Sequence, residues 1–432
     1  MMILTAVVVA DPNGTEWVQL GADIDGESAG DRSGYDVSLS LDGSRVAVGA
    51  DLNDNGGGTD AGHVRVYEYD SSAWVQLGAD IDGEAADDKS GCPVSLSAYG
   101  SRVAIGSPHN DGSGSSAGHV RVYEYDSSSW IQLGADIDGE AADDKSGYAV
   151  SLSANGTRVA IGATHNTNGG NSYAGHVRVY EYDSSTWVQL GSDIDGEDEE
   201  DKSGYAVSLS SDGNYVAIGA PFNDANGANA GHVRVYEYDS SSWVQRGADI
   251  DGESGDDRSG YAVSISSDGG RVAIGAPFNS EIDWDVGHVR VYEYDSSTWV
   301  QLGGDIDGDA ADDMFGIAVS LSFDGSRVSI GSKYNDAGGT TNAGYVKVFD
   351  YNISSSAWIQ LGADINGDVA YGHSGHAVSL SGDGSRVAIG AYNASSTAGQ
   401  VRLWRLAYLG SDQPTGQPTD QPTDQPSGQP SD

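Results

Sequence analysis

In this chain of 432 residues, the residues best spaced for chemistry are carboxylates at alternating positions. In Asp80-Ile81-Asp82-Gly83-Glu84 an acid stands at every second position around a glycine. Like charges at this density repel one another, and a bound cation would relieve the repulsion. Because Ca²⁺ takes several hard oxygen ligands, the recurring segment is a candidate calcium site. In four copies of the segment the candidate ligands are Asp80, Asp82, Glu84, Asp136, Asp138, Glu140, Asp193, Asp195, Glu197, Asp249, Asp251 and Glu253.

The same carboxylates have a simpler interpretation, which stays open. Glycine comes two positions too early for an EF-hand loop, so the spacing does not specify a calcium loop. The chain has 65 Asp and Glu against 21 Lys and Arg, a net charge of −44, and a solvated acidic rim would keep such a protein soluble. This charge excludes binding of bare nucleic acid and favours a neutral glycan or a basic protein surface as the partner.

A second recurring loop pairs a bulky residue with asparagine. The seven pairs are Leu52-Asn53, His109-Asn110, His165-Asn166, Phe222-Asn223, Phe278-Asn279, Tyr334-Asn335 and Tyr392-Asn393. Each asparagine is predicted to close a local turn through its side chain, with a metal or ligand contact as the alternative. The bulky residues either pack together or form a contact patch, for which Phe222, Phe278, Tyr334 and Tyr392 are the ligand-binding candidates. Trp284 joins them as an anchor for a protein or sugar, unless it folds back over a gap.

Histidine recurs in a third place, at the start of the same segment in five units. These residues are His63, His119, His176, His232 and His288, with Tyr345 and Gln400 in the two remaining units. Replacement by Tyr and Gln favours hydrogen bonding over metal ligation or acid-base work. Catalysis needs one asymmetric constellation, whereas nearly every polar group here is repeated, so the chain is not predicted to be an enzyme.

The elements that must position these residues are set by a repeat. The tryptophans Trp17, Trp74, Trp130, Trp187, Trp243, Trp299 and Trp358 are spaced by 57, 56, 57, 56, 56 and 59 residues. Each unit contains four short alternating segments rich in Val, Ile, Leu and Tyr, which predict strands rather than helices. In residues 148–153 bulky side chains share one face and small ones the other, which suits sheets stacked face to face.

These units predict an all-β, seven-bladed propeller of four-stranded antiparallel blades. The first tryptophan segment, at Trp17, precedes any complete unit, whereas the last unit, 374–406, lacks its fourth strand. The amino-terminal strand is therefore expected to complete the last blade and to close the ring. A linear solenoid is the alternative, although neither end shows the polar capping unit that an open stack needs.

The predicted domain boundaries follow from composition. Residues 1–14 are an additional strand or the remnant of a secretory signal, 15–410 are the propeller, and 411–432 repeat Gln-Pro-Thr/Ser and predict a disordered Pro/Thr/Gln-rich tail. A single cysteine, Cys92, excludes an internal disulfide framework. No run approaches the roughly 18 apolar residues that a membrane span needs, so membrane insertion is not expected.

With these units in view, the chain resembles the FG-GAP repeats of integrin-α-like propellers over about residues 17–406. Phe315-Gly316 supplies the first pair of letters, and Gly219-Ala220-Pro221 and Gly275-Ala276-Pro277 supply the triplet. The resemblance implies an extracellular, non-catalytic recognition propeller. Calcium-binding copies in that family carry an aspartate-rich loop between the first two strands, whereas here that link is a tight turn such as Asp212-Gly213. The metal sites of the family are therefore not carried over.

The sequence thus predicts an extracellular or cell-surface adhesion propeller that binds a protein or glycan through its acidic loop face, with Ca²⁺ as the cofactor considered. Export is consistent with four N-glycosylation sequons, at Asn13, Asn155, Asn352 and Asn393. It also agrees with a tail similar to the stalks of secreted algal wall proteins. Two alternatives stay open: a propeller-type carbohydrate-active enzyme that uses carboxylates of adjacent loops as acid and base, and a purely structural wall protein.

Overall fold

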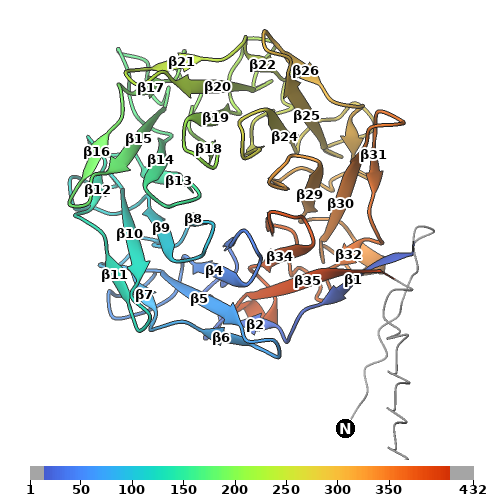
Figure 1. Ribbon diagram of the computed structural model, residues 1–432, viewed down its shortest axis with the longest axis horizontal. Coiled ribbons are helices and arrows are strands. Elements are labelled where there is room, and N and C mark those ends of the chain that lie inside the picture. Colours follow the sequence, from blue (N-terminus) through green and yellow to red (C-terminus); the bar gives the residue numbers. More distant parts are fainter. Residues whose placement is uncertain (1–13, 409–432) are drawn as a thin grey trace, which may run out of the picture.

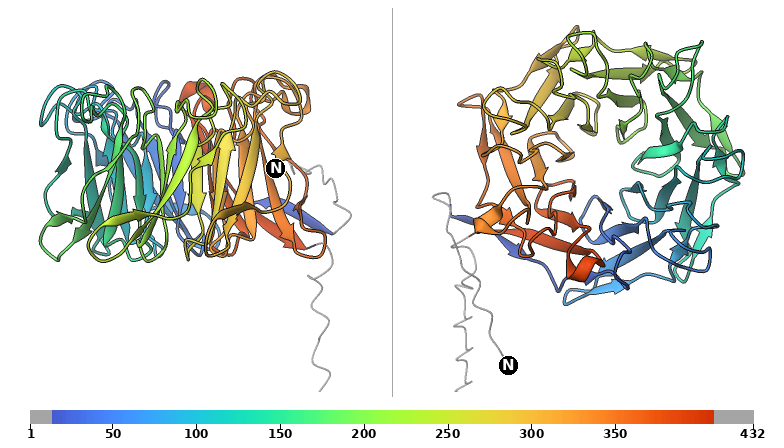
Figure 2. Two further views of the ribbon diagram at one scale, coloured as in Figure 1. Left: turned by 90° about the horizontal axis from the view of Figure 1, so that it is seen from above. Right: turned by 180° about the vertical axis from the view of Figure 1, so that it is seen from behind.

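Strands form where the sequence alternates β-branched and small residues, and they end at turns that Asp, Asn and Gly favour. The computed structural model describes residues 14–408, in which seven antiparallel sheets stand around one axis (Figure 1). Each sheet holds four strands and a further strand of two residues. Seen from the side, the sheets form a disc with loops on both faces (Figure 2). The prediction of a seven-bladed propeller of four-stranded antiparallel blades is confirmed.

The strands are described by their place in the blade, from the axis outwards. The first strands are β3 (Asp36–Leu39), β8 (Val94–Leu96), β13 (Ser146–Leu152), β18 (Ala206–Leu209), β23 (Ala262–Ile265), β28 (Ala318–Leu321) and β33 (Ala377–Leu380). The second strands are β4 (Arg45–Ala50), β9 (Arg102–Ser107), β14 (Arg158–Ala163), β19 (Tyr215–Ala220), β24 (Arg271–Ala276), β29 (Arg327–Ser332) and β34 (Arg386–Ala391). The third strands are β5 (His63–Tyr69), β10 (His119–Tyr125), β15 (His176–Tyr182), β20 (His232–Tyr238), β25 (His288–Tyr294), β30 (Tyr345–Asn352) and β35 (Gln400–Tyr408).

The outermost strands complete the blades. They are β6 (Trp74–Gln76), β11 (Trp130–Gln132), β16 (Trp187–Gln189), β21 (Trp243–Gln245), β26 (Trp299–Gln301), β31 (Ala357–Gln360) and β1 (Thr15–Gln19). The two-residue strands are β7 (Ile81–Asp82), β12 (Ile137–Asp138), β17 (Ile194–Asp195), β22 (Ile250–Asp251), β27 (Ile306–Asp307), β32 (Ile365–Asn366) and β2 (Ile24–Asp25). Two short 3₁₀ helices, η1 (Ala337–Gly339) and η2 (Ser395–Thr397), lie in loops.

The acidic segment after each tryptophan strand is only partly a loop. β6 pairs with the second half of β5, and β7 pairs with the first half of the same strand. Ile81 of β7 is buried in the core, whereas Asp82 faces solvent. The outer strand is therefore interrupted by a short bulge and continues through the segment that the sequence suggested was a link between blades.

The core lies between neighbouring blades, as the division into bulky and small faces predicts. Val103 and Ile105 of β9 pack against Ala47 of β4 and Val64 of β5 in the preceding blade. All four side chains are fully buried. Each sheet thus fills the space above the small residues of its neighbour, which a single blade could not do by itself.

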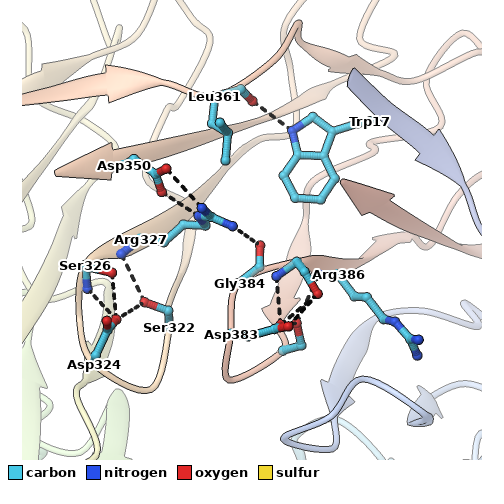
Figure 3. A network of polar contacts seen from close by, with 12 residues as sticks. Trp17, Ser322, Asp324, Ser326, Arg327, Asp350, Leu361, Asp383, Gly384 and Arg386 are labelled. Atoms are coloured by element: carbon cyan, nitrogen blue, oxygen red, sulfur yellow. Dashed lines mark hydrogen bonds and ion pairs between the residues drawn. The ribbon is translucent and has the colours of Figure 1, made fainter. Parts of the chain in front are cut away.

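The two ends of the described chain close the ring. β1 pairs antiparallel with β35, with Trp17 opposite Leu406, so the predicted closure is confirmed and the open solenoid is excluded. The indole N–H of Trp17 donates to the carbonyl of Leu361 at 2.8 Å (Figure 3). At the same junction the Arg327 guanidinium pairs with Asp350 and donates to the carbonyl of Gly384 (Figure 3).

The other repeat tryptophans make the same bond to the preceding blade. Trp74 donates to Leu20 and Trp187 to Leu133, both at 2.8 Å. Glycine is required beside the indole at Gly78, whose φ is +72° and where a Cβ would lie 3.2 Å from Cδ1 of Trp130. The tryptophan repeat therefore marks junctions between blades rather than a ligand site.

The innermost strands satisfy their free edges across the blades. The N–H of Leu96 donates to Oγ of Ser38 in the preceding blade at 2.9 Å, and all seven blades repeat this bond. Below it a second ring joins backbone groups, for example Leu41 N–H to the Ala98 carbonyl at 2.8 Å and Gly382 N–H to the Leu41 carbonyl. Two closed rings of hydrogen bonds thus surround the axis.

Two predicted segments fall outside the described residues: residues 1–13 of the amino-terminal segment 1–14, and the tail 411–432. Within residues 14–408 no helix has the length and hydrophobicity needed to cross a membrane.

Candidate binding site at the mouth of the channel

The first strands begin at one end of the central channel, on the face that carries the long loops. The equivalent residues near these starts are Tyr35, Cys92, Tyr148, Tyr205, Tyr261, Ile317 and His376. The ring centroids of Tyr148 and Tyr205 are 5.0 Å apart, and those of Tyr205 and Tyr261 4.8 Å apart. His376 contacts Tyr35 at 4.8 Å where the last blade meets the first. These residues form an aromatic collar around the channel.

The four ring residues predicted as a contact patch form a second layer on this collar. Phe222 packs on Tyr205 with 6.1 Å between centroids, and Phe278 packs on Tyr261 at 6.0 Å. Tyr392 packs on Tyr35 at 5.7 Å, and its hydroxyl lies 2.7 Å from Nδ1 of His373. Tyr334 likewise contacts His373. All four are half-buried, so they both pack together and offer one edge to solvent.

Cationic side chains gather at the same place, and the sequence reasoning missed them. The set, called the mouth ring below, is Arg32, Lys89, Lys145, Lys202, Arg258 and Lys333. Nζ of Lys202 lies 4.3 Å from the centroid of Phe222, and the guanidinium of Arg258 lies 4.2 Å from that of Phe278. Such contacts hold cations over aromatic faces. A recurring Asp-Lys/Arg-Ser-Gly pattern, as at residues 88–91, is the signal that could have revealed them.

The mouth ring differs from most other cations of the chain because it is poorly neutralised. On the blades, Arg102 pairs with Glu124 at 2.9 Å and Arg121 with Glu84 at 3.4 Å. Within residues 14–408, only Arg32 of the mouth ring has a carboxylate within ion-pair distance, Asp51 at 3.7 Å. Burial, followed by the nearby Lys202 and Lys89, lowers the pKa of Lys145. Burial and the same kind of cationic neighbour lower the pKa of His165 to about 4. The centre of the loop face is therefore positive inside an acidic periphery.

The predicted calcium ligands do not converge within one segment. Oδ1 of Asp80 accepts a hydrogen bond from Gln76 at 2.6 Å, and its Oδ2 faces His63. Asp82 points to solvent on the strand β7, and Glu84 reaches Arg121 of the next blade. The copies Asp136, Asp138, Glu140, Asp193, Asp195, Glu197, Asp249, Asp251 and Glu253 are placed in the same way. Alternate carboxylates of one segment thus belong to two different junctions.

The loop asparagines do more than close a local turn. Oδ1 of Asn223 accepts from the N–H of Ala225 at 2.9 Å, which is the predicted turn. Its Nδ2 donates to the buried Asp201 at 3.0 Å, which the sequence did not suggest. In six of the seven blades the aspartate that ends the acidic segment, such as Asp201, therefore ties two loops together instead of facing solvent.

Trp284 stands out from the loop face, with 68% of its surface exposed, and Ile282 beside it is 64% exposed. A backbone hydrogen bond holds the loop, because the N–H of Asp312 donates to the Trp284 carbonyl at 2.8 Å. The indole does not fold back over a gap. Tyr371 is 54% exposed on another loop of the described chain. These side chains are thus accessible to a partner.

Asp36 breaks the symmetry inside the channel, where five other blades carry alanine. Its carboxylate accepts bonds from the N–H groups of Val37 and Val94 at 2.9 and 2.7 Å. Burial nevertheless raises the pKa of Asp36 to about 7. The neighbouring Cys92 has no activating cation that outweighs burial, which together with Asp51 and Asp36 raises the pKa of its thiol. Cys92 therefore stands as an unactivated thiol where other blades carry tyrosine.

We expect Asp36→Ala to remove a pH dependence of stability. The folded pKa lies above the ordinary value of 3.8, so the folded state keeps a proton that the unfolded chain has lost. That contribution is complete below about pH 4 and is lost as the pH rises through about 7, by up to about 4 kcal/mol. The free energy of unfolding of the variant and of the parent is measured from pH 4 to 9. Relative to the parent, the variant should gain stability as the pH rises from 4 to about 7, and the difference should then stay constant. Asp36→Asn, which keeps an acceptor without the charge, is the control, and a difference that is constant over the whole range would contradict the assignment.

The opposite end of the channel is apolar. A hollow of about 520 Å³ is lined by Leu41, Ala98, Tyr99, Phe323 and Gly382, with neighbouring aspartates. Tyr99 is 81% exposed where most other blades place an aspartate that accepts bonds from its own turn, as Asp42 does from Ser44. The two faces of the disc thus differ in character.

Comparison with known proteins supports the fold. A family model described as the PT disordered repeat matches residues 411–432. No curated protein matches the chain in sequence. The crystal structure of the Cps50 (Swd1) β-propeller domain of Myceliophteria thermophila is similar at 11% identity and a TM-score of 0.56, covering 89% of this chain and 99% of that one. The fold is a seven-bladed β-propeller.

At 11% identity the likeness shows the fold of the propeller alone. No model of the FG-GAP family matches, so of that resemblance the fold is supported and the family is not.

Proposed function

We propose that this propeller is a non-catalytic recognition protein of the cell surface or the extracellular space, which binds an acidic group of a protein or glycan at the mouth ring. The observation that carries the proposal is the convergence of six weakly neutralised cations on an aromatic collar. The four sequons, the Pro-Thr-rich tail and the resemblance of the units to FG-GAP repeats support the extracellular location.

The distribution of charge changes the partner expected from the net charge alone. A chain at −44 repels anions at long range, but that repulsion is screened beyond about 8 Å at physiological salt. At the mouth itself the local charge is positive, and an incoming carboxylate or sulfate would relieve the repulsion among Lys89, Lys145 and Lys202. Aromatic faces next to the cations suit the apolar face of a sugar ring or an aromatic side chain. We therefore expect an anionic ligand rather than a neutral one.

A binding screen tests the proposal. The full chain is presented with dextran and dextran sulfate, with neutral and uronate-containing algal polysaccharides, and with acidic and basic proteins, each with Ca²⁺ and with chelator. Saturable binding confined to the anionic members, independent of Ca²⁺, supports the mouth ring. Binding that requires Ca²⁺ would move the ligand to the acidic periphery, and turnover of a polysaccharide would favour the carbohydrate-active enzyme. No saturable ligand in the whole screen would favour the structural wall protein.

Trp284→Ala is expected to weaken binding of a selected protein or polysaccharide about tenfold without changing stability. The indole is exposed, so its loss creates no cavity, whereas an anchoring aromatic contributes on the order of 1–2 kcal/mol. Affinity and thermal unfolding are measured side by side. The control is Tyr99→Ala, which removes an exposed aromatic ring from the opposite face. Equal effects of the two variants on affinity would exclude an anchor at Trp284.

A further inference from the structure

We propose that five junctions between blades each bind one divalent transition-metal ion, of which Zn²⁺ is the natural probe, through a glutamate, a histidine and an aspartate. The five clusters are Glu27, His63 and Asp80; Glu84, His119 and Asp136; Glu140, His176 and Asp193; Glu197, His232 and Asp249; and Glu253, His288 and Asp305. The sites are independent of the mouth ring and of the proposed function.

Each cluster gathers three ligand atoms from two blades. In the second cluster Glu84 comes from the link that leaves β7, His119 opens β10, and Asp136 immediately precedes β12. One ligand atom of each of the three residues lies within 4.8 Å of the others. Two ligands on a tetrahedral zinc ion are about 3.4 Å apart, so a movement of the exposed glutamate and small shifts of the other two would complete the set.

The histidine side chain is the observation that points to a ligand. The side chains of His63, His119, His176 and His288 are at most 2% exposed. Nδ1 of His119 lies 3.8 Å from Oδ2 of Asp136, which is too long for a hydrogen bond. Among the described residues, both ring nitrogens of His232 and of His288 lack a hydrogen-bond partner. A buried polar group without a partner is costly, and the hydrogen bonding that the sequence predicted for the histidines is absent at His232 and His288.

The aspartate is held in an orientation that suits a metal ligand. Nε2 of Gln132 donates to Oδ1 of Asp136 at 2.6 Å, which leaves Oδ2 directed at the imidazole. The same Gln-to-Asp bond, at 2.6 Å, recurs at Asp80, Asp193, Asp249 and Asp305. Supporting bonds of this kind orient the ligands in metal sites.

The two blades without histidine differ at the corresponding contact. In the last blade Gln400 replaces histidine and donates to Asp23 at 2.6 Å, so the contact is closed directly. In the sixth blade Tyr345 replaces it, and among the described residues its buried hydroxyl has no hydrogen-bond partner. There Nζ of Lys347 binds both oxygens of Asp309 at 2.6 and 2.7 Å, in the place of the Arg121–Glu84 pair.

The arginine beside each cluster does not prevent a metal ion from binding. Arg121 lies 3.4 Å from Glu84 but is anchored by a bond of 2.8 Å to the Asp82 carbonyl, so the half-exposed glutamate can turn to a metal while the arginine stays. Solvent reaches the carboxylates, which leaves room for a water as fourth ligand. Imidazole with two carboxylates favours Zn²⁺ over Ca²⁺, which prefers oxygen alone.

Metal titration of the full, tag-free chain tests the proposal. After treatment with a chelator and dialysis, Zn²⁺ is added and binding is followed by calorimetry, with visible absorption of Co²⁺ as a second signal of nitrogen and oxygen ligation. We expect five equivalents, and four for His119→Gln, a substitution that reproduces the contact of Gln400. The variant with all five histidines changed to Gln should bind none and lose any rise in melting temperature with Zn²⁺.

Two matched variants separate the clusters from other histidines. His109→Gln and His165→Gln remove imidazoles of the loop face that belong to no cluster, and each should leave five equivalents. Glu84→Gln should weaken one site of the five, which tests the cluster without touching histidine. The proposal is overturned if Zn²⁺ binds at one equivalent or fewer, or if the fivefold variant keeps its zinc. It is also overturned if Ca²⁺ stabilises the parent and that variant equally, since the acidic rim would then be the binding surface.

Discussion

Removing residues 1–19 is expected to destabilise the whole propeller and to make it self-associate. The deletion takes away β1, whose five residues pair with β35, together with the indole of Trp17. Loss of the tryptophan alone costs about 3 kcal/mol, and the lost strand pairing adds several backbone hydrogen bonds. It also exposes an edge of β35, which can pair with another chain. Denaturant unfolding and sedimentation should show a lower midpoint and larger species.

Two control variants separate the effect of opening the ring from the effect of losing local contacts. Removal of residues 1–13 leaves β1 in place and should change neither measurement. Trp187→Ala removes an equivalent tryptophan inside the chain, and we expect destabilisation of about 3 kcal/mol without self-association. A deletion of residues 1–19 that unfolds like the parent and stays monomeric would show that the strand does not hold the ring closed.

Neutralising three cations of the mouth ring is expected to weaken anion binding strongly without lowering stability. The variant combines Lys145→Ala, Lys202→Ala and Arg258→Ala and so loses three converging cations. Each cation contributes roughly 1 kcal/mol to binding, so the affinity for dextran sulfate should fall about 100-fold at low salt. The loss should shrink as salt is added. Repulsion from Lys202, which after burial contributes to the lowered pKa of Lys145, is removed at the same time, so the melting temperature should not fall. Binding by calorimetry and thermal unfolding give the two measurements.

The control for net charge is Arg405→Ala, which removes an exposed cation from β35. It should leave the affinity for dextran sulfate nearly unchanged. If Arg405→Ala and the triple variant weaken binding in proportion to the charge removed, the anion responds to net charge and the mouth ring is not a site. If the triple variant binds as the parent does, the proposed function is wrong.

The repeat explains why the architecture could be predicted. The strand at Trp17 and the incomplete last unit predicted a shared blade. Each end of the repeat region lacks a pairing partner, and pairing the two ends with each other satisfies both. Periodicity was less informative about the acidic segments. Ile81 is a single apolar residue between aspartates, and its burial in a continued outer strand depends on pairing with Val64, 17 positions away. Pairing over that distance leaves no local signature in the sequence.

The sites show the same division. Phe222 and Phe278 were found because an aromatic residue recurs before asparagine, but the cations that lie over them belong to other segments. Likewise Asp80 and Glu84 are neighbours in sequence yet serve different junctions, because the chain crosses from one blade to the next between them. Sequence spacing measures distance along the chain, whereas a propeller brings together residues about one blade apart.

The amino-acid sequence by itself determined the number of blades, the strand faces and the closure, because side-chain alternation and repeat length are local properties that pairing must respect. Only the tertiary structure decided which charges meet. It paired most of the 21 cations with carboxylates on the blades and left five of the six cations of the mouth ring without an ion pair, and it placed a buried imidazole from one blade beside a carboxylate from another. Electrostatic contacts act through space, so their partners are fixed by the ring and not by the order of residues.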